Sequence, residues 1–326
     1  MTVKEKLREI FASYPDEWFN GNNLAQKLDV SRNAVWKAVQ ELKDENVNIQ
    51  SNGKLGYSSP VDSDVFSSIL MQKNLRTKEL GKKIIFYPVI ESTNTTAKQL
   101  AEEGASHGTV IIADCQKGGR GRLGKTFHSP AGTGIYMSVI LRPDFSTELS
   151  NLLTACTAVS TEKSLCQFCK KNIKIKWVND LFISNKKVCG ILTEASISCE
   201  SRSINYAIIG IGVNVRNTKE NFPDELQSIV TSLEEEGSEK INRCVLAAEI
   251  LNNLEIELSH ISDRKFLDEY REHSNLIGNE VTIVDGMGNE IKGTAVGIDN
   301  NASLLVKMND GQVKTISSGT VQAEPA

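Results

Sequence analysis

The stretch GGRGRLGK, residues 118–125, lies in the middle of the chain and decides between several fold classes. With Thr126 it matches the nucleotide-triphosphate loop GxxxxGK[ST], and its glycines also match the dinucleotide fingerprint GxGxxG. Both motifs need a helix that begins directly after the glycines, so that the helix N-terminus faces a phosphate. The chain continues instead with FHSPAGTG, residues 127–134, whose proline and two glycines do not start a helix. The sequence therefore predicts a glycine-rich loop and disfavours both nucleotide motifs.

The composition is that of an ordinary globular protein. The 326 residues are enough for two or three domains, with 40% hydrophobic and 24% charged residues. A net charge of −4 neither indicates nor excludes a nucleic-acid partner, because a small domain can carry a local basic face. No apolar run approaches the ~20 residues that span a bilayer, and the charged N-terminus has no signal-peptide core. We therefore expect a cytoplasmic protein without membrane contact.

The seven cysteines are an odd number in a chain without an export signal, which favours reduced thiols. Cys166 and Cys169 form one CxxC pair, but zinc needs two further ligands at regular spacing. We interpret the pair as packing or surface thiols and predict no metal site in the protein. The four histidines have no evident Ser or Cys partner, which argues against a histidine-based relay.

The first 62 residues have the pattern of a winged helix-turn-helix. Apolar residues at helical spacing predict three short helices, and Ser31 is a suitable N-cap for the third. The predicted inner stripe of that third helix is Val35, Ala38, Val39 and Leu42. After it, apolar runs at 47–49 and 55–57 flank Asn52-Gly53, which signals a hairpin with a two-residue turn.

The outer face of the third predicted helix carries the candidate DNA-binding residues. They are Arg32, Asn33, Trp36, Lys37 and Gln40. Arg, Asn and Gln suit base edges and Lys suits phosphates, so this face favours a recognition helix in a DNA major groove. The alternative is a small helical domain with an ordinary polar face, because residues 1–62 contain 8 Lys and Arg against 9 Asp and Glu.

The remaining chain divides into a linker, an α/β region and a β-rich tail. Residues 63–82 are interpreted as a linker with a short helix, and residues 83–272 alternate strands and helices. The predicted strands are 84–87, 110–113, 135–141, 173–177, 187–194 and 206–215, and the predicted helices are 93–103, 147–169 and 245–261. In the tail, 277–326, short β runs are separated by Asp285-Gly286, Asp299-Asn300 and Asp310-Gly311, which predicts a small barrel of hairpins.

Cations and hydrogen-bond donors gather at loops and strand ends of the α/β region. They lie in Ser92-Thr93-Asn94 at a helix start, in the glycine loop with Arg120 and Arg122, and in KWVND (176–180), KVCGIL (187–192) and GIGVN (210–214). The paired glycines of GIGVN allow a flat ligand to approach the backbone. Fixed cations are in excess, and a histidine-based relay is not evident. This combination favours a reaction in which cations hold two anionic reactants together, without acid–base or covalent catalysis.

In this order, and behind a winged helix, these motifs resemble those of the bifunctional biotin–protein ligases that double as biotin-operon repressors. The similarity covers nearly the whole chain. It implies an α+β multidomain fold: a winged helix-turn-helix DNA-binding domain (1–62), a linker (63–82), a central mixed-sheet α/β ligase domain of the class II synthetase type (83–272) and an SH3-like C-terminal β-barrel (277–326).

The resemblance implies a two-step reaction. Biotin and ATP give biotinyl-5′-adenylate and pyrophosphate, and the biotinyl group then passes to a lysine of a biotin carboxyl carrier protein. In the first step an ionised carboxylate meets an anionic phosphate, and two unit charges at ~4 Å repel by about 4 kcal/mol at an effective dielectric of ~20. Fixed cations offset this repulsion, and magnesium neutralises the leaving pyrophosphate.

The same resemblance assigns roles to single residues. Lys187 and Arg120 are implied as catalytic cations. The implied biotin-binding residues are Ser92, Thr93, Asn94, Gln116, Arg120, Gly121, Arg122 and Lys187, and the implied nucleotide-binding residues are Lys176, Asn179, Asp180 and Asn214. The adenylate is implied as a co-repressor that promotes a homodimer on an inverted-repeat operator.

Two positions depart from the family pattern, and two alternatives stay open. Val178 stands where the family usually has proline, and residues 318–324 lack the arginine expected near the C-terminus. One alternative is a lipoate–protein ligase of the same fold, against which Gln116 and the DNA-binding domain argue. The other is a ligand-sensing repressor without catalysis, which has no need of Lys187 between two reactants.

Overall fold

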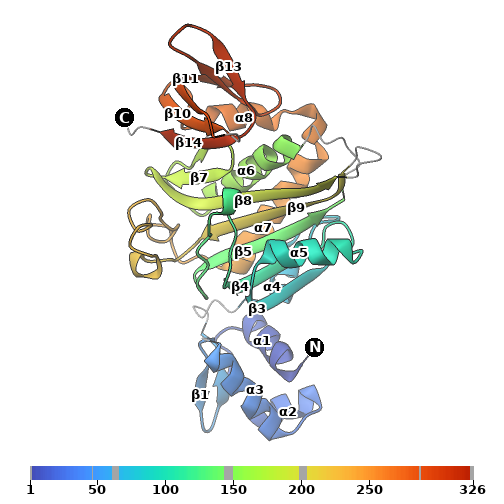
Figure 1. Ribbon diagram of the computed structural model, residues 1–326. Coiled ribbons are helices and arrows are strands. Elements are labelled where there is room, and N and C mark those ends of the chain that lie inside the picture. Colours follow the sequence, from blue (N-terminus) through green and yellow to red (C-terminus); the bar gives the residue numbers. More distant parts are fainter. Residues whose placement is uncertain are drawn as a thin grey trace.

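The computed structural model describes residues 2–45, 47–60, 66–142, 150–197, 204–285 and 288–323. Three parts follow one another along the molecule (Figure 1). A small helical unit with a two-stranded hairpin comes first, a seven-stranded sheet covered by helices lies in the middle, and a five-stranded sheet ends the chain. Each part corresponds to one region of the sequence, as the resemblance implied.

The N-terminal unit consists of α1 (Val3–Ser13), α2 (Gly21–Leu28), α3 (Arg32–Asp44), β1 (Gln50–Asn52) and β2 (Gly56–Ser58). Ser31 caps α3, since its side chain accepts a hydrogen bond from the Ala34 N–H at 3.1 Å. The predicted inner stripe of α3 is buried against α1 and α2 in one apolar cluster that includes Leu7 and Leu24. This confirms the prediction of three helices followed by a wing.

The turn of the wing is one residue longer than predicted. Asn52 pairs with Gly56, so the connection has three residues and the strands begin later than expected. The Asn52 side chain accepts hydrogen bonds from the N–H groups of Lys54 and Leu55, which closes the turn. Gly56 follows with φ +101°, a value that favours glycine. The prediction of a two-residue turn at Asn52-Gly53 is therefore wrong.

The central sheet has the order β3-β4-β5-β9-β8-β7-β6, and all neighbouring strands are antiparallel except the parallel pair of β3 and β4. Its strands are β3 (Ile84–Ile90), β4 (Val110–Gln116), β5 (Gly134–Leu141), β6 (Lys174–Lys176), β7 (Asp180–Ile183), β8 (Lys186–Ile197) and β9 (Ile204–Asn214). The helices are α4 (Ser68–Asn74), α5 (Thr93–Glu102), α6 (Ser150–Cys166), α7 (Arg243–Ser259) and α8 (Phe266–Glu272). This is the expected mixed sheet.

The sheet is buried on both faces. Ala97 and Ala101 of α5 pack with Ile111 and Ile140 on one face, whereas α6 and α7 form the main core on the other. Alternation along β4 explains the division, because Ile111 points to the α5 side and its neighbours to the main core. Packing on these two faces fixes the strands on which the pocket is built.

Several local boundaries differ from the predictions. The KWVND motif does not end one strand but forms the turn between β6 and β7, with Lys176 paired to Asp180. The helix expected over 147–169 is α6, and residues 143–149 lie outside the described part. Within the predicted linker, Met71 and Leu80 are buried in the main core, so this segment packs as part of the central unit.

The C-terminal sheet is antiparallel, with the order β13-β12-β11-β10-β14. Its strands are β10 (Glu280–Asp285), β11 (Glu290–Ile298), β12 (Leu304–Lys307), β13 (Val313–Ile316) and β14 (Gly319–Ala323). The predicted turns at Asp299-Asn300 and Asp310-Gly311 fall between strands, and Gly286 lies outside the described residues. Among the described residues, no helix is long and apolar enough to cross a membrane.

Candidate functional site

An open pocket lies on the central sheet beneath the glycine loop, with about 450 Å³ of empty space when the solvent at its mouth is included. It is lined by Ser92, Thr93, Asn94, Gln116, Arg120, Gly121, Arg122, Phe127, Tyr136, Met137, Asn179, Lys187, Gly190, Ile191, Leu192, Gly210, Ile211 and Gly212. All eight predicted biotin-binding residues are in this set, together with Asn179. The structure thus brings together residues that lie as far apart in the sequence as Ser92 and Lys187.

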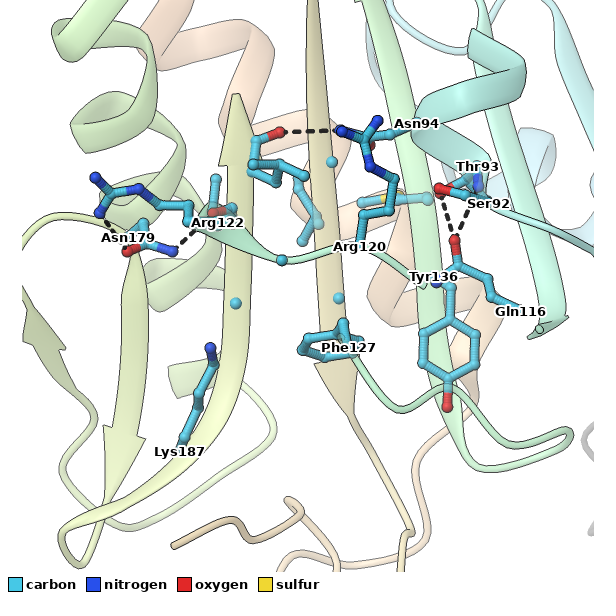
Figure 2. A pocket seen from close by; sticks show the side chains of 18 residues that line it. Ser92, Thr93, Asn94, Gln116, Arg120, Arg122, Phe127, Tyr136, Asn179 and Lys187 are labelled. Carbon is cyan, nitrogen blue, oxygen red and sulfur yellow. Dashed lines mark hydrogen bonds between the residues drawn. The ribbon is translucent and has the colours of Figure 1, made fainter. Parts of the chain in front are cut away.

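One side of the pocket is a network of neutral side chains (Figure 2). The Thr93 N–H and hydroxyl both donate to Gln116 Oε1, at 2.8 and 3.1 Å. Gln116 Nε2 donates to Ser129 Oγ at 2.9 Å, which fixes the orientation of the amide. Ser138 Oγ lies 2.8 Å from Thr93 Oγ1 and 2.6 Å from Asn94 Oδ1. These groups are held in place before any ligand arrives.

The glycines of the sheet form the floor of the pocket. Gly190 of β8 is paired with Gly212 of β9, and a Cβ at Gly212 would lie 2.6 Å from the Phe127 ring. A Cβ at Gly190 would lie 3.0 Å from Lys187 Nζ. A side chain at Gly210 would collide with Asn94. Glycine is therefore needed where these side chains approach the backbone.

The glycine loop forms a narrow hairpin above this floor, and no helix follows it. Gly121 N–H donates to Lys125 O at 2.7 Å, and Phe127 N–H donates to Gly119 O at 2.9 Å. The only helical part between them is the 3-10 turn η2 (Arg122–Gly124). This confirms that the match to two phosphate-loop motifs is accidental, because the helix that both motifs require is replaced by a hairpin.

The two arginines of the loop have different partners, and Figure 2 shows Arg122 beside its partner Asn179. Arg120 pairs with Glu194 at 3.2 Å, and both side chains are partly exposed. Arg122 donates to Asn179 Oδ1 at 3.2 Å. Burial lowers the pKa of the Arg122 guanidinium, although Asp180 nearby opposes this shift. The loop is thus tied to β8 and to the turn between β6 and β7.

The other side of the pocket is charged. Lys187 Nζ lies 2.8 Å from Asp180 Oδ1 and 5.9 Å from the centre of the Phe127 ring. Lys176 is placed over the Phe182 ring at 5.4 Å, and burial lowers its pKa, with Asp180 opposing that shift. The three cations Arg122, Lys176 and Lys187 therefore surround one carboxylate and leave a net positive charge.

Three predicted nucleotide-binding residues do not line the pocket. Asp180 contacts both Lys187 and Asn179, and Lys176 is the strand partner of Asp180. Asn214 is buried at the end of β9, where Nδ2 donates to Thr231 O at 3.0 Å. Its Oδ1 accepts no hydrogen bond from the described residues. Asn214 thus supports the segment that follows β9 and does not face the pocket.

Sequence reasoning missed several residues of the site. Phe127 and Tyr136 form the aromatic part of the wall and meet edge to face at 6.3 Å between ring centres. Burial raises the pKa of Tyr136 to about 12, so its hydroxyl stays protonated. Ser138 and Glu194 hold Asn94 from two sides. A lone serine in the apolar run IYMSVIL was the available signal for Ser138.

The CxxC pair plays no part in this site. Cys166 is exposed and Cys169 buried, and both are free thiols, as are the other described cysteines; Cys199 lies outside the described part. Across the described ranges no cluster of three or more His, Cys, Asp or Glu side chains is arranged to hold a metal ion.

Comparison with family models divides the chain in the same three parts. Residues 4–58 match an HTH domain, residues 86–214 the biotin/lipoate A/B protein ligase family, and residues 276–322 the biotin protein ligase C terminal domain. These matches define a ligase of the biotin and lipoate class that carries a helix-turn-helix domain.

Whole-chain relatives narrow this class. The chain is 33% identical to the bifunctional ligase/repressor BirA of Bacillus subtilis over 334 residues, covering 98% of each chain. It is 28% identical to the same protein of Escherichia coli, covering 100% of this chain and 98% of that one. The biotin protein ligase from Aquifex aeolicus in complex with biotin and ATP superposes with a TM-score of 0.63 at 28% identity, over 74% of this chain and 100% of that one. The chain belongs to the family of bifunctional biotin ligase/repressors, which confirms the resemblance.

Proposed function

We propose that this chain is an ATP-dependent biotin–protein ligase and a biotin-responsive repressor. The observation that best supports the ligase activity is a pocket in which a neutral hydrogen-bonding network faces a cationic wall that contains Lys187 (Figure 2). Biotin has a neutral ureido head and an anionic tail, and ATP is an anion. A pocket with one neutral and one cationic side suits both substrates at once.

The first step joins the two substrates. A carboxylate oxygen of biotin attacks the α-phosphorus of ATP, the bond to the β-phosphate oxygen breaks, and pyrophosphate leaves. We assign Lys187 to the negative charge that develops on the phosphoryl oxygens, because its ammonium group lines the pocket. Magnesium enters with ATP, since this ion is usually held by substrate phosphates, waters and one or two carboxylates.

The neutral side is assigned to the ureido head. Ser92, Thr93, Asn94 and Gln116 offer fixed donors and acceptors there. Arg120, Gly121 and Arg122 of the loop close over biotin, and Arg120 exchanges its Glu194 partner for a ligand anion. The nucleotide is assigned to Lys176, Asn179, Asp180 and Asn214. Asn214 acts indirectly, through the segment around Thr231 that it holds in place.

In the second step the amine of a carrier-protein lysine attacks the acyl carbon of biotinyl-5′-adenylate. An amide bond forms, AMP leaves, and the amine loses a proton. The proposed acceptor of the biotinyl group is a biotin carboxyl carrier protein, and the proposed location of the reaction is the cytoplasm.

ATP–pyrophosphate exchange tests the ligase. We expect exchange of labelled pyrophosphate into ATP with biotin and none with lipoate. Exchange with lipoate alone would support a lipoate–protein ligase. Absence of exchange with either acid, while biotin still binds, would leave a ligand-sensing repressor without catalysis.

The repressor function rests on the exposed face of α3. Arg32, Asn33, Trp36 and Lys37 are exposed and Gln40 is half-buried, on a helix that lies at the end of the molecule away from the central sheet (Figure 1). In the described part of the chain, the central unit and the C-terminal sheet lie away from α3, so this face is free to enter a major groove. We propose that biotinyl-5′-adenylate acts as co-repressor and promotes a homodimer that binds two half-sites.

A mobility-shift assay with the upstream region of a biotin-synthesis operon tests this part. We expect a shift that needs both biotin and ATP and is lost in Arg32→Ala. Lys27→Ala, on the neighbouring helix α2, is the matched control and should keep the shift. A shift that is independent of the ligands would argue against the adenylate as co-repressor.

The domain boundaries of the proposal are 1–62, 63–82, 83–272 and 277–326. Limited proteolysis tests them, with the first cleavage expected within residues 63–82 and outside the buried part around Met71.

A further inference from the structure

The turn between β6 and β7 is held from two directions. Trp177 and Val178, at its centre, are almost fully buried. Trp177 Nε1–H donates to the carbonyl of Ala302 in the C-terminal sheet at 2.8 Å. The Tyr270 hydroxyl of α8 donates to the carbonyl of Val178 at 2.9 Å. Both hydrogen bonds are buried, so water cannot readily replace them.

The Ala302 carbonyl, which accepts the hydrogen bond from Trp177, is itself held in place. Asp299 Oδ1 accepts hydrogen bonds from the N–H groups of Asn301 and Ser303, both at 2.8 Å. The backbone closes the same turn through Asp299 N–H to Ser303 O at 2.9 Å. Ala302 is buried with φ +59°. The turn 299–303 therefore holds the Ala302 carbonyl in a single orientation, towards Trp177.

Helix α8 joins the two parts. Tyr270 reaches the turn between β6 and β7, and the next residue, Arg271, donates to Ile298 O and to Asn300 Oδ1, each at 2.8 Å. Figure 1 shows the C-terminal sheet on the side of the central unit that carries β7, α6 and α8. Burial raises the pKa of the Tyr270 hydroxyl, so it is protonated and remains a donor at neutral pH.

The far end of the same turn reaches the pocket. Asn179 accepts from Arg122 and donates to Ile191 O at 2.8 Å. Asp180 pairs with Lys187 at 2.8 Å. A shift of the turn would therefore move the partners of both cations. Misplacement by ~1 Å in an active site can reduce the rate by ~10²-fold, even when the change lies outside the chemistry.

We propose that Trp177, Tyr270 and the turn 299–303 are positioning elements of the active site, so that the C-terminal sheet sets the place of Asn179 and Asp180. Neither Trp177 nor Tyr270 lines the pocket, and both act through the turn. The inference rests on the proposed ligase, because it assigns Asn179 and Asp180 to the nucleotide side.

Tyr270→Phe tests the inference in the full-length chain. It removes one hydroxyl and keeps the ring. We expect kcat/KM for ATP in biotin-dependent pyrophosphate exchange to fall about 10-fold, mainly through KM for ATP. The Kd for biotin without ATP should change by less than about 3-fold, because the ureido side is held by other elements.

Tyr206→Phe is the matched control. Tyr206 is also buried, and its hydroxyl bonds Glu102 at 3.0 Å on the α5 side of the sheet, away from the pocket. Its hydrogen bond is part-buried, so we expect Tyr206→Phe to lower the melting temperature by less than Tyr270→Phe and to leave kcat/KM for ATP unchanged. A purely structural role for Tyr270 would make the two variants alike, and this result would overturn the inference.

Arg271→Gln provides a second test if Tyr270→Phe does not fold. It releases the turn 299–303 from α8 and keeps the Trp177 hydrogen bond, so we expect a fall of about 3-fold in kcat/KM for ATP. Lys265→Gln, at the start of the same helix, should have no effect. Equal kinetics in both would overturn the inference. A wild-type chain without any biotin-dependent exchange would instead overturn the proposed function.

Discussion

The side of the pocket that contains Ser92, Thr93 and Gln116 is neutral, whereas the side that contains Arg122, Asn179 and Lys187 is charged (Figure 2). On the neutral side, Thr93 and Gln116 bond to other neutral groups of the protein, whereas Asn94 also donates to the Glu194 carboxylate. On the charged side, Lys187 is paired with Asp180, and Arg120, between the two sides, is paired with Glu194.

This difference suggests that the neutral side mainly binds biotin and that the charged side mainly serves catalysis. A ligand on the neutral side meets dipoles that are already oriented, so little reorganisation opposes its binding. An anion on the charged side must share or replace a protein carboxylate, so its net gain is the difference between two ion pairs. We therefore expect the neutral side to set the affinity for biotin and the charged side to act mainly in the transition state, where negative charge increases.

The largest expected effect is that of Lys187→Ala. Under the role proposed for Lys187, the substitution removes a cation at the developing charge, and we expect adenylate formation to fall by ~10²-fold or more. The Kd for biotin should stay within about 3-fold of the wild-type value, because the neutral side is intact. Single-turnover formation of biotinyl-5′-adenylate and calorimetric titration with biotin measure the two effects separately.

Lys186→Ala is the control for the loss of one positive charge. Lys186 is the neighbouring residue on β8, and it is not among the residues that line the pocket. It should leave both measurements unchanged. If Lys187→Ala weakens biotin binding as strongly as it slows the reaction, the division between the two sides is wrong.

Gln116→Ala tests the opposite side. The substitution removes a pocket-lining amide that is assigned to the ureido head, and a buried ureido group left without a partner costs ~1–3 kcal/mol. We expect the Kd for biotin to rise about 10-fold, since ~1.4 kcal/mol corresponds to a factor of ten. At saturating biotin, KM for ATP should change little.

Gln99→Ala, on the exposed face of α5, is the matched control, because its amide bonds only Glu103 among the described contacts. It should bind biotin like the wild type. An increase in KM for ATP in Gln116→Ala, as large as the increase in the Kd for biotin, would show that the two sides are not independent.

The charged side should also respond to pH when the neutral side does not. Burial lowers the pKa of Lys176, so this residue loses its charge at a lower pH than an exposed lysine. If Lys176 binds the nucleotide as proposed, its ammonium group attracts the phosphates below that pKa, and this attraction is lost above it. KM for ATP should therefore rise by a factor of about 5 towards alkaline pH, while the Kd for biotin stays flat.

Lys176→Arg should flatten this alkaline rise, because a guanidinium group keeps its charge over the same range. The measurement is the pH profile of kcat/KM for ATP in the two proteins. An identical alkaline rise in both would assign the titration to another group.

The sequence predicted those features that depend on neighbouring residues. Helical spacing and the cap at Ser31 identified α3, and Pro130 after the glycine loop ruled out a phosphate-binding helix. The wing turn was misjudged because Asn52-Gly53 also suits a longer turn, in which Asn52 bonds two backbone N–H groups. Local patterns therefore identify an element more securely than its register.

Features that depend on strand order could not be predicted in the same way. Tyr136 lines the pocket, and Ser138 holds Thr93 and Asn94, because β5 lies between β4 and β9, an arrangement that no local pattern encodes. Trp177 and Ala302 are 125 residues apart in the sequence, and their hydrogen bond depends on how the two sheets pack. The motifs carried by the family resemblance identified many of the pocket residues, but not the residues that hold them in place.

Glu194→Gln has the smallest expected effect and tests whether the carboxylates compete with ligands. The pair of Arg120 and Glu194 is partly exposed, and such pairs contribute about 0–1 kcal/mol. Glutamine keeps an oxygen that can accept from Asn94, as Glu194 does at 2.8 Å, and it removes the charge that holds Arg120. If Arg120 must leave Glu194 to bind a ligand anion, the Kd for biotin should fall about 2-fold and at most about 5-fold. Glu102→Gln, at the end of α5, is a control for the loss of one negative charge. Weaker binding in Glu194→Gln would mean that this carboxylate serves mainly to orient Asn94, and that the charged side gains affinity without an internal competitor.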